Sequence, residues 1–342
     1  MAKAGSASRV LLYGCLLSAL PAPAAETGGR ADWLGRSWGV MIHYLPEWID
    51  PAREWTSEGW SRQVDAFDVE AVARQLQEAR AGYCLLSIGQ NSGFYLAPNP
   101  TYDRLVGRPE SRCSRRDLVA DLAAALEPRG VRLLVYLPAG PPSRDPTAGS
   151  ALRWQGDGRA NREFQRRWEE VIRDWSRRWG TRVSGWWFDG CARPNTMYRS
   201  PEPPNFASFA AAARAGNPAA VVAFNAGMHY PVFSVSPHED YTAGLVYDFE
   251  RELANPRRLD SGRLDGARLH VVSFLGETWG RGEPRFPPEQ AAAHTRKVLE
   301  LDGAVTWDVP VAADGTIPGP FLARLRAIRD AASTAPRPPP RP

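Results

Sequence analysis

The chain has 342 residues, of which 43% are hydrophobic, and it contains 13 tryptophans. That length allows a single large α/β domain, and the hydrophobic content is sufficient for a sizeable core. The formal net charge is +4, and basic residues are interspersed with acids rather than gathered in one stretch. A mixed surface of this kind argues against a nucleic-acid-binding stripe, so we expect no nucleic-acid partner.

Residues 1–25 have the pattern of a secretory signal peptide. Two basic residues precede an apolar run over residues 10–20, and Ala22 and Ala24 suit a cleavage site. Removing the segment takes away both basic residues and no acid, so the net charge falls from +4 to +2. No other stretch approaches the length of a membrane span. We therefore predict export, to the periplasm or outside the cell, with lipid anchoring at Cys15 as the less favoured alternative.

Apolar runs and amphipathic helices alternate along residues 26–332. Short, nearly continuous apolar runs are typical of buried parallel strands. Strands are predicted at residues 38–44, 83–88, 131–137, 183–189, 220–225, 269–275 and 303–310, with a further strand somewhere between residues 238 and 250. Helices are predicted after a cap at Asp68, after an S-x-x-D cap formed by Ser114 and Asp117, and after a cap at Asn161, and also over residues 206–214, 287–301 and 318–332. The helix after Asn161 has the clearest 3.6-residue apolar period.

These alternations predict an α/β fold, a single-domain (β/α)8 TIM-like barrel over residues 26–332. The proline-rich residues 333–342 are predicted to form a disordered tail. A doubly wound sheet is the alternative, but no glycine-rich phosphate loop follows the first strand. In a TIM barrel, the catalytic groups lie at the carboxyl ends of the strands.

Asp189 ends the strand predicted at residues 183–189, with Gly190 directly behind it. An acid at the last position of a buried barrel strand indicates a catalytic carboxylate. The alternative is that Asp189 caps the next segment or pairs with Arg193.

Further polar and aromatic residues follow the other predicted strand ends. They are His43, Gln90, Asn91, Asn225, His238, Glu239, Asp240, Glu277 and Asp308, with Trp187, Trp279 and Trp307 near them in sequence. Carboxylates, amides and aromatic rings without a metal-ligand cluster suit sugar chemistry. Cleavage of a glycoside with retention needs two carboxyl groups about 5–5.5 Å apart, one as nucleophile and one as acid/base. Asp189 fits the first role, and Glu277 and Glu239 are the leading candidates for the second, followed by Glu250.

Each candidate also has an ordinary structural interpretation. Glu277 could pair with Arg281 on the surface, and Glu239 could belong to a hydrogen-bonded corner that shapes its loop. His43 could be a core histidine, and Trp187 and Trp279 could be packing residues. The sequence has neither a G-x-S-x-G elbow nor an H-E-x-x-H motif, so we expect no metal and no cofactor.

The three cysteines that follow the predicted signal peptide are widely spaced. Cys84, Cys113 and Cys191 form no disulfide framework and no C-x-x-C metal pattern. At most one bridge could form among them.

Over most of residues 35–332, the chain resembles the catalytic domain of the α-L-fucosidase family, glycoside hydrolase family 29. The stretch 39–43 resembles the first strand of that family, 187–190 its nucleophile strand, 278–280 a rim segment and 314–318 the exit from strand eight. The resemblance implies a retaining glycosidase with Asp189 as nucleophile.

The chain departs from the pattern of that family at several positions. Gln90 and Asn91 stand where two histidines are usual, Tyr44 replaces a tryptophan, and Asp308 replaces an asparagine. The residues after Thr242 lack the usual acid, so the resemblance does not place the acid/base. The predicted substrate-binding set is His43, Tyr44, Gln90, Asn91, Trp187, Asn225, His238 and Trp279. We expect an exported retaining glycosidase acting on a carbohydrate; the alternatives are a glycosidase for another sugar and a glycan-binding barrel without turnover.

Overall fold

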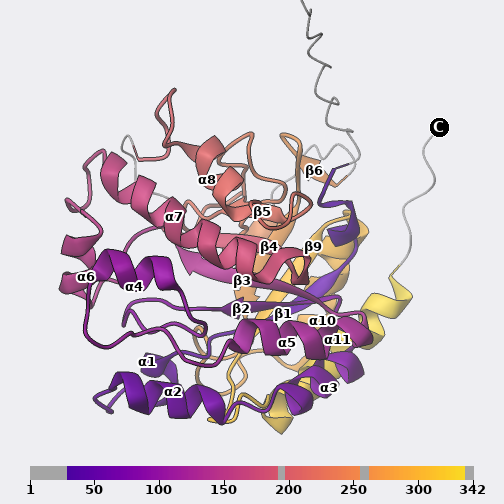
Figure 1. The fold of residues 1–342 in the computed structure, drawn as a ribbon. Coiled ribbons are helices and arrows are strands. Elements are labelled where there is room, and N and C mark those ends of the chain that lie inside the picture. The colour runs from indigo at the N-terminus through magenta and orange to yellow at the C-terminus, as the bar shows by residue number, and fades with distance from the viewer. Residues whose placement is uncertain (1–28, 192–196, 255–261, 336–342) are drawn as a thin grey trace, which may run out of the picture.

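The computed structural model describes residues 29–191, 197–254 and 262–335 (Figure 1). The predicted signal peptide, Cys15 and Arg193 lie outside these ranges. A central sheet contains seven parallel strands in the order β5-β4-β3-β2-β1-β9-β8. These are β1 (Trp38–Ile42), β2 (Tyr83–Ser87), β3 (Arg132–Pro138), β4 (Val183–Asp189), β5 (Val221–Phe224), β8 (His270–Phe274) and β9 (Ala304–Val309). The short strands β6 (Arg263–Leu264) and β7 (Ala267–Arg268) form a separate antiparallel pair.

Helices surround the curled sheet (Figure 1). They are α1 (Pro46–Ile49), α2 (Ser57–Asp65), α3 (Val69–Ala79), α4 (Pro100–Val106), α5 (Leu118–Leu126), α6 (Pro146–Ala151), α7 (Arg162–Trp179), α8 (Phe206–Ala213), α9 (Phe249–Leu253), α10 (Pro288–Glu300) and α11 (Gly319–Thr334), with 3-10 turns η1 (Asp32–Leu34), η2 (Glu127–Arg129) and η3 (Gly180–Arg182). The fold is therefore α/β and barrel-like. None of the described helices combines the length and apolarity needed to cross a membrane.

Of the three predicted caps, the one at Asp68 forms as expected, while α5 is capped by Asp117 alone rather than by the predicted Ser114–Asp117 pair. The side chain of Asp68 accepts a hydrogen bond from the amide of Ala71, and Asp117 accepts one from Ala120. Asn161 instead has a φ of 45° and makes no side-chain cap bond to α7. Its side chain binds the backbone of the preceding loop, accepting from Gln155 N at 2.8 Å. The helix starts where predicted, although Asn161 stabilises the loop rather than the helix end.

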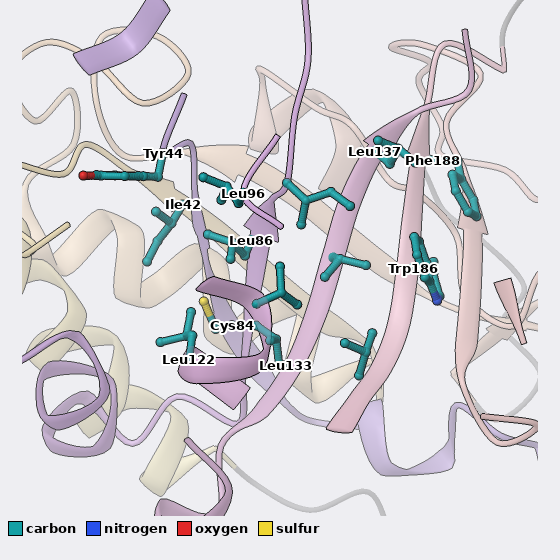
Figure 2. Close-up of a cluster of buried hydrophobic side chains, with 14 of the residues drawn as sticks. Ile42, Tyr44, Cys84, Leu86, Leu96, Leu122, Leu133, Leu137, Trp186 and Phe188 are labelled. Atoms are coloured by element: carbon teal, nitrogen blue, oxygen red, sulfur yellow. The ribbon is translucent and has the colours of Figure 1, made fainter. Parts of the chain in front are cut away.

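Residues on each strand alternate between two separate cores, because successive side chains point to opposite faces of a sheet. Outward residues such as Cys84 on β2 and Trp186 on β4 pack under the helices, and Figure 2 shows this set with Leu122 of α5. Inward residues such as Tyr136 and Trp187 form a second cluster on the concave face. Asp189 lies two residues after Trp187, so it faces the same concave side.

The strand predicted at residues 238–250 is replaced by an irregular segment, residues 239–246. Within this segment, the amide of Asp240 donates to Val222 O of β5, while that of Val246 donates to Val272 O of β8. Gly244 has a φ of +67°, and a Cβ at this position would lie 1.8 Å from His270 O. Close approach to β8 and a left-handed backbone both require glycine here, which prevents regular strand geometry. The segment thus lies between β5 and β8 without being a regular strand.

Candidate functional site

Asp189 is held by three hydrogen bonds at the carboxyl end of β4. Tyr136 Oη donates to Oδ2 at 2.7 Å, and Asn225 Nδ2 donates to Oδ1 at 2.7 Å. The amide of Gly190 also donates to Oδ1, at 2.8 Å. Gly190 has a φ of +77°, a conformation that glycine adopts without steric cost. The carboxylate is therefore fixed in one orientation at the rim of the sheet.

Tyr136 connects Asp189 to the floor of the site. Its ring stacks on Trp187 with centroids 5.3 Å apart, and Gln90 Nε2 donates to its hydroxyl at 2.7 Å. Burial, followed by the negative charge of Asp189, raises the pKa of Tyr136 well above its ordinary value. The hydroxyl therefore stays protonated and remains a donor to Asp189.

His43 follows β1 and pairs with the buried carboxylate of Asp308. His43 Nδ1 lies 2.6 Å from Asp308 Oδ1, and Asp308 also accepts a hydrogen bond from Gly280 N. Burial raises the pKa of Asp308, while His43 opposes that rise. The imidazole stacks on Trp48 at 5.3 Å and lies near the Trp279 ring at 6.1 Å. It is also 5.8 Å from the Tyr136 ring, so His43 belongs to the same site as Asp189.

Glu47 is a site residue that the sequence reasoning missed. It lies in α1 with only 8% of its surface exposed, and its Oε1 accepts from Ser92 N at 3.2 Å. Its Oε2 is buried and has no hydrogen-bond partner among the described residues. The next residue, Trp48, stacks on His43 with centroids 5.3 Å apart, so α1 borders the site. The position of Glu47 four residues after His43 was the available signal.

The two acids predicted as acid/base have different surroundings. Glu277 is exposed in the turn after β8, and Arg281 binds Glu47 O rather than Glu277 among the described residues. Glu239 is 7% exposed, and its two carboxylate oxygens accept from the amides of Phe224 and Val235. Burial raises the pKa of Glu239 to about 7. The side chain of Glu239 thus stabilises the loop beside β5 through these two hydrogen bonds.

His238, Glu239 and Asp240 are predicted to follow a strand end at the rim, but the backbone contacts place them where the irregular segment begins. Asp240 binds Val222, the second residue of β5, and its carbonyl accepts from Arg268 N, which precedes β8. The backbone of Asp240 therefore lies level with the start of β5, whereas the side chain of Glu239 reaches Phe224, the last residue of that strand. His238 is exposed there, and Asp240 pairs with Arg214.

Three other predicted residues lie outside the group around Asp189. Tyr44 is fully buried; its hydroxyl donates to Ala313 O at 2.6 Å, and burial raises its pKa to about 12. Asn91 Oδ1 accepts from Ser143 Oγ at 2.7 Å and so holds the loop after β3. Glu250 pairs with His294 and Lys297 on the surface.

Of the predicted residues, the structure brings together His43, Gln90, Trp187, Asp189, Asn225, Trp279 and Asp308. An oriented carboxylate beside a tyrosine, two amides, an imidazole and indole rings can bind a polyhydroxylated ring and attack it. The free cysteines Cys84, Cys113 and Cys191 are all buried, and none takes part in a bridge.

No family model matches the chain, and no curated protein matches it by sequence. Solved structures do match it. The endo-fucoidan hydrolase P5AFcnA from glycoside hydrolase family 107 is 17% identical, with a TM-score of 0.68 over 91% of this chain and 95% of that one. The endo-fucoidan hydrolase MfFcnA4 of the same family is 18% identical, with a TM-score of 0.70 over 88% of this chain. This chain spans 53% of the length of MfFcnA4.

A family 29 α-L-fucosidase from Bacteroides thetaiotaomicron is 14% identical, with a TM-score of 0.58 over 88% of this chain and 72% of that one. At these identities, the likenesses establish a shared fold.

Proposed function

We propose that this protein is a retaining glycoside hydrolase that acts on fucose-type glycosides, with Asp189 as nucleophile. The main support is the position of Asp189 at a strand end, where Tyr136, Asn225 and the Gly190 amide orient its carboxylate. Groups held in this way attack without first reorganising. The fold neighbours hydrolyse fucoidan and α-L-fucosides, which supports the choice of sugar.

In this mechanism, Asp189 attacks the anomeric carbon as the bond to the leaving oxygen breaks, which gives a glycosyl ester. Water then cleaves the ester and restores the carboxylate. Tyr136 and Asn225 keep the carboxylate pointing at the anomeric carbon. Glu47 and His43 bind sugar hydroxyls.

For the acid/base, Glu277 is favoured over Glu239. Glu277 is exposed in the same turn as Trp279, and no hydrogen bond or ion pair within the described residues holds its carboxylate. Glu239 would have to break two hydrogen bonds to backbone amides. Protonation of the leaving oxygen by Glu277 completes the first step, and the same carboxylate then takes a proton from the attacking water.

Covalent trapping tests the nucleophile. Incubation with 2-fluoro-fucosyl fluoride is expected to add one fluorofucosyl group to the peptide that contains Asp189, as read by mass spectrometry. Asp189→Asn is expected to give no adduct and no release from an aryl α-L-fucoside, whereas Asp121→Asn on the exposed face of α5 should behave as wild type. Ready turnover by Asp189→Asn would rule out this nucleophile.

A glycan-binding barrel without turnover is the second candidate. It is favoured by the placement of the two predicted acids, because one is engaged by the backbone and the other is exposed. Calorimetry with L-fucose beside long incubations with the aryl fucoside separates the two. Binding without any product would support this second function, and product formation would exclude it.

A further inference from the structure

Exposed apolar side chains cluster on one rim of the molecule. Within the described ranges, the exposed large hydrophobic residues are Met228, Phe233, Tyr247 and Leu301, with 42 to 46% of their surface exposed. The first three lie on loops that follow β5 and the segment 239–246. Leu301 lies at the carboxyl end of α10, before β9, and so at the opposite end of the strands. A gathering of this kind on one rim marks a binding surface more often than isolated exposed residues do.

The rim cluster continues from the proposed site as an aromatic strip, which comprises Trp279, Tyr247, Tyr230, Met228, His229 and Phe233. The strip begins at Trp279, whose ring lies 6.1 Å from His43 and 6.2 Å from Tyr247. Trp279 Nε1 donates to Tyr247 Oη at 3.4 Å. Tyr247 N in turn donates to Tyr230 Oη at 2.8 Å. The rings are therefore held side by side by contacts among themselves.

The far end of the strip returns to the nucleophile. Phe233 and His229 pack edge to face with centroids 4.9 Å apart, and both line a shallow hollow together with Asn225. Asn225 is the residue that donates to Asp189 Oδ1. The hollow thus adjoins the point at which the anomeric carbon would be attacked.

We propose that the aromatic strip is a second sugar-binding subsite, which holds a ring of an oligosaccharide substrate next to the sugar bound at Asp189. This inference rests on the proposed function. Flat aromatic rings offer an apolar surface that suits the apolar face of a pyranose, and the hydrogen bonds among Trp279, Tyr247 and Tyr230 hold that surface in place. Because both ends of the strip border the site, at Trp279 and at the hollow beside Asn225, a ring bound on it would be joined directly to the sugar that Asp189 attacks. The substrate class is therefore an oligosaccharide or polysaccharide rather than a fucoside with a small leaving group.

Length-dependent binding tests the subsite. The probes are L-fucose, an α-linked fucose disaccharide and an α-linked fucose tetrasaccharide, titrated calorimetrically into Asp189→Asn so that no turnover occurs. We expect both oligosaccharides to bind more tightly than L-fucose. Phe233→Ala and Tyr247→Ala, each added to Asp189→Asn, should lose roughly two- to tenfold of the oligosaccharide affinity, the range expected for one aromatic contact, while L-fucose binding is unchanged.

Leu301→Ala is the matched control, because it removes an equally exposed apolar side chain from the other end of the strands. It should leave all three affinities unchanged. The subsite would be overturned if the three probes bound with equal affinity, or if neither Phe233→Ala nor Tyr247→Ala changed the affinity for the oligosaccharides. Either result would leave the proposed function standing. A failure of all three probes to bind would overturn both, and trapping on Asp189 by the fluorosugar reports on the proposed function separately.

Discussion

At the scale of single residues, the hydroxyl of Tyr136 links two side chains of the site. It donates a hydrogen bond to Asp189 and accepts one from Gln90. We expect Tyr136→Phe to lower kcat on an aryl fucoside by roughly a hundredfold, the usual effect of removing one preorganised hydrogen-bond donor. The stacked contact with Trp187 remains in the variant, so the melting temperature should change little. Steady-state kinetics and thermal unfolding measure both, and an unchanged kcat would contradict a positioning role.

Glu239 should make stability fall as pH rises. Its pKa is about 7 in the folded chain against an ordinary value of 4.5, because burial disfavours the charged form. Between these values the unfolded chain releases the proton first, so the folded state binds more protons and the free energy of unfolding decreases with pH. Below pH 4.5, the carboxyl is protonated in both states and contributes no slope.

The loss across this window is at most about 3 kcal/mol, from about 1.4 kcal/mol for each pH unit. Glu239→Gln does not titrate, so the difference in unfolding free energy between wild type and variant should change by that order between pH 4.5 and pH 7.5. Urea unfolding of both proteins at the two pH values provides the measurement. Parallel pH profiles for wild type and Glu239→Gln would refute the account.

The site residues that the sequence predicts most directly are those at the end of a predicted strand. Asp189 and Asn225 follow apolar runs immediately, and parallel strands bring such positions to one edge. Tyr136 lies inside its run, and only the register that pairs it with Trp187 places it on the concave face. Glu47 belongs to a four-residue helix, which is too short to give a periodic pattern.

At the scale of elements, Gly244 determines how residues 239–246 meet β8. We expect Gly244→Ala to destabilise the fold by several kcal/mol, because the new Cβ would collide with the backbone of His270 at 1.8 Å. Chemical unfolding of the purified variant measures the loss. Gly107→Ala is the control: its φ of +69° is similar, but no atom lies within 4 Å of the point that a Cβ would occupy, so only about 1 kcal/mol of backbone strain is expected. Equal losses would show that the contact with β8 is unimportant.

The same glycine explains why the sixth predicted strand, between residues 238 and 250, forms only isolated parallel bridges, at Tyr241 and Leu245. Seven predicted strands coincide with β1–β5, β8 and β9 to within two residues, because each is a buried apolar run. Residues 238–250 combine apolar positions with Gly244 and with groups that bind neighbouring backbones, such as Thr242, whose hydroxyl donates to His270 O. Local propensity cannot reveal such contacts, since they depend on where β5 and β8 lie. The helices that were missed, such as α4 and α6, are short and begin at prolines in loop-like sequence.

At the scale of the whole molecule, three thiol groups lie in separate parts of the fold. Cys84 lies on β2, Cys113 in the loop before α5, and Cys191 directly after Gly190 at the rim. All three are buried and unbridged. Burial raises the pKa of Cys84 to about 12, and it raises those of Cys113 and Cys191 further above the ordinary value. Since the thiolate is the reactive form, the native protein should resist alkylation at all three positions.

We therefore expect iodoacetamide at pH 8 to leave Cys84, Cys113 and Cys191 unmodified in the native protein, and to modify each once urea unfolds it. Mass spectrometry of the three peptides along a urea series reads the sites separately. A chain whose strands and helices share one continuous core should unfold as a unit, so the three modification midpoints should coincide. A lower midpoint for Cys191 alone would show that the rim around Asp189 opens before the central sheet does, and would place the flexibility of the site in that loop.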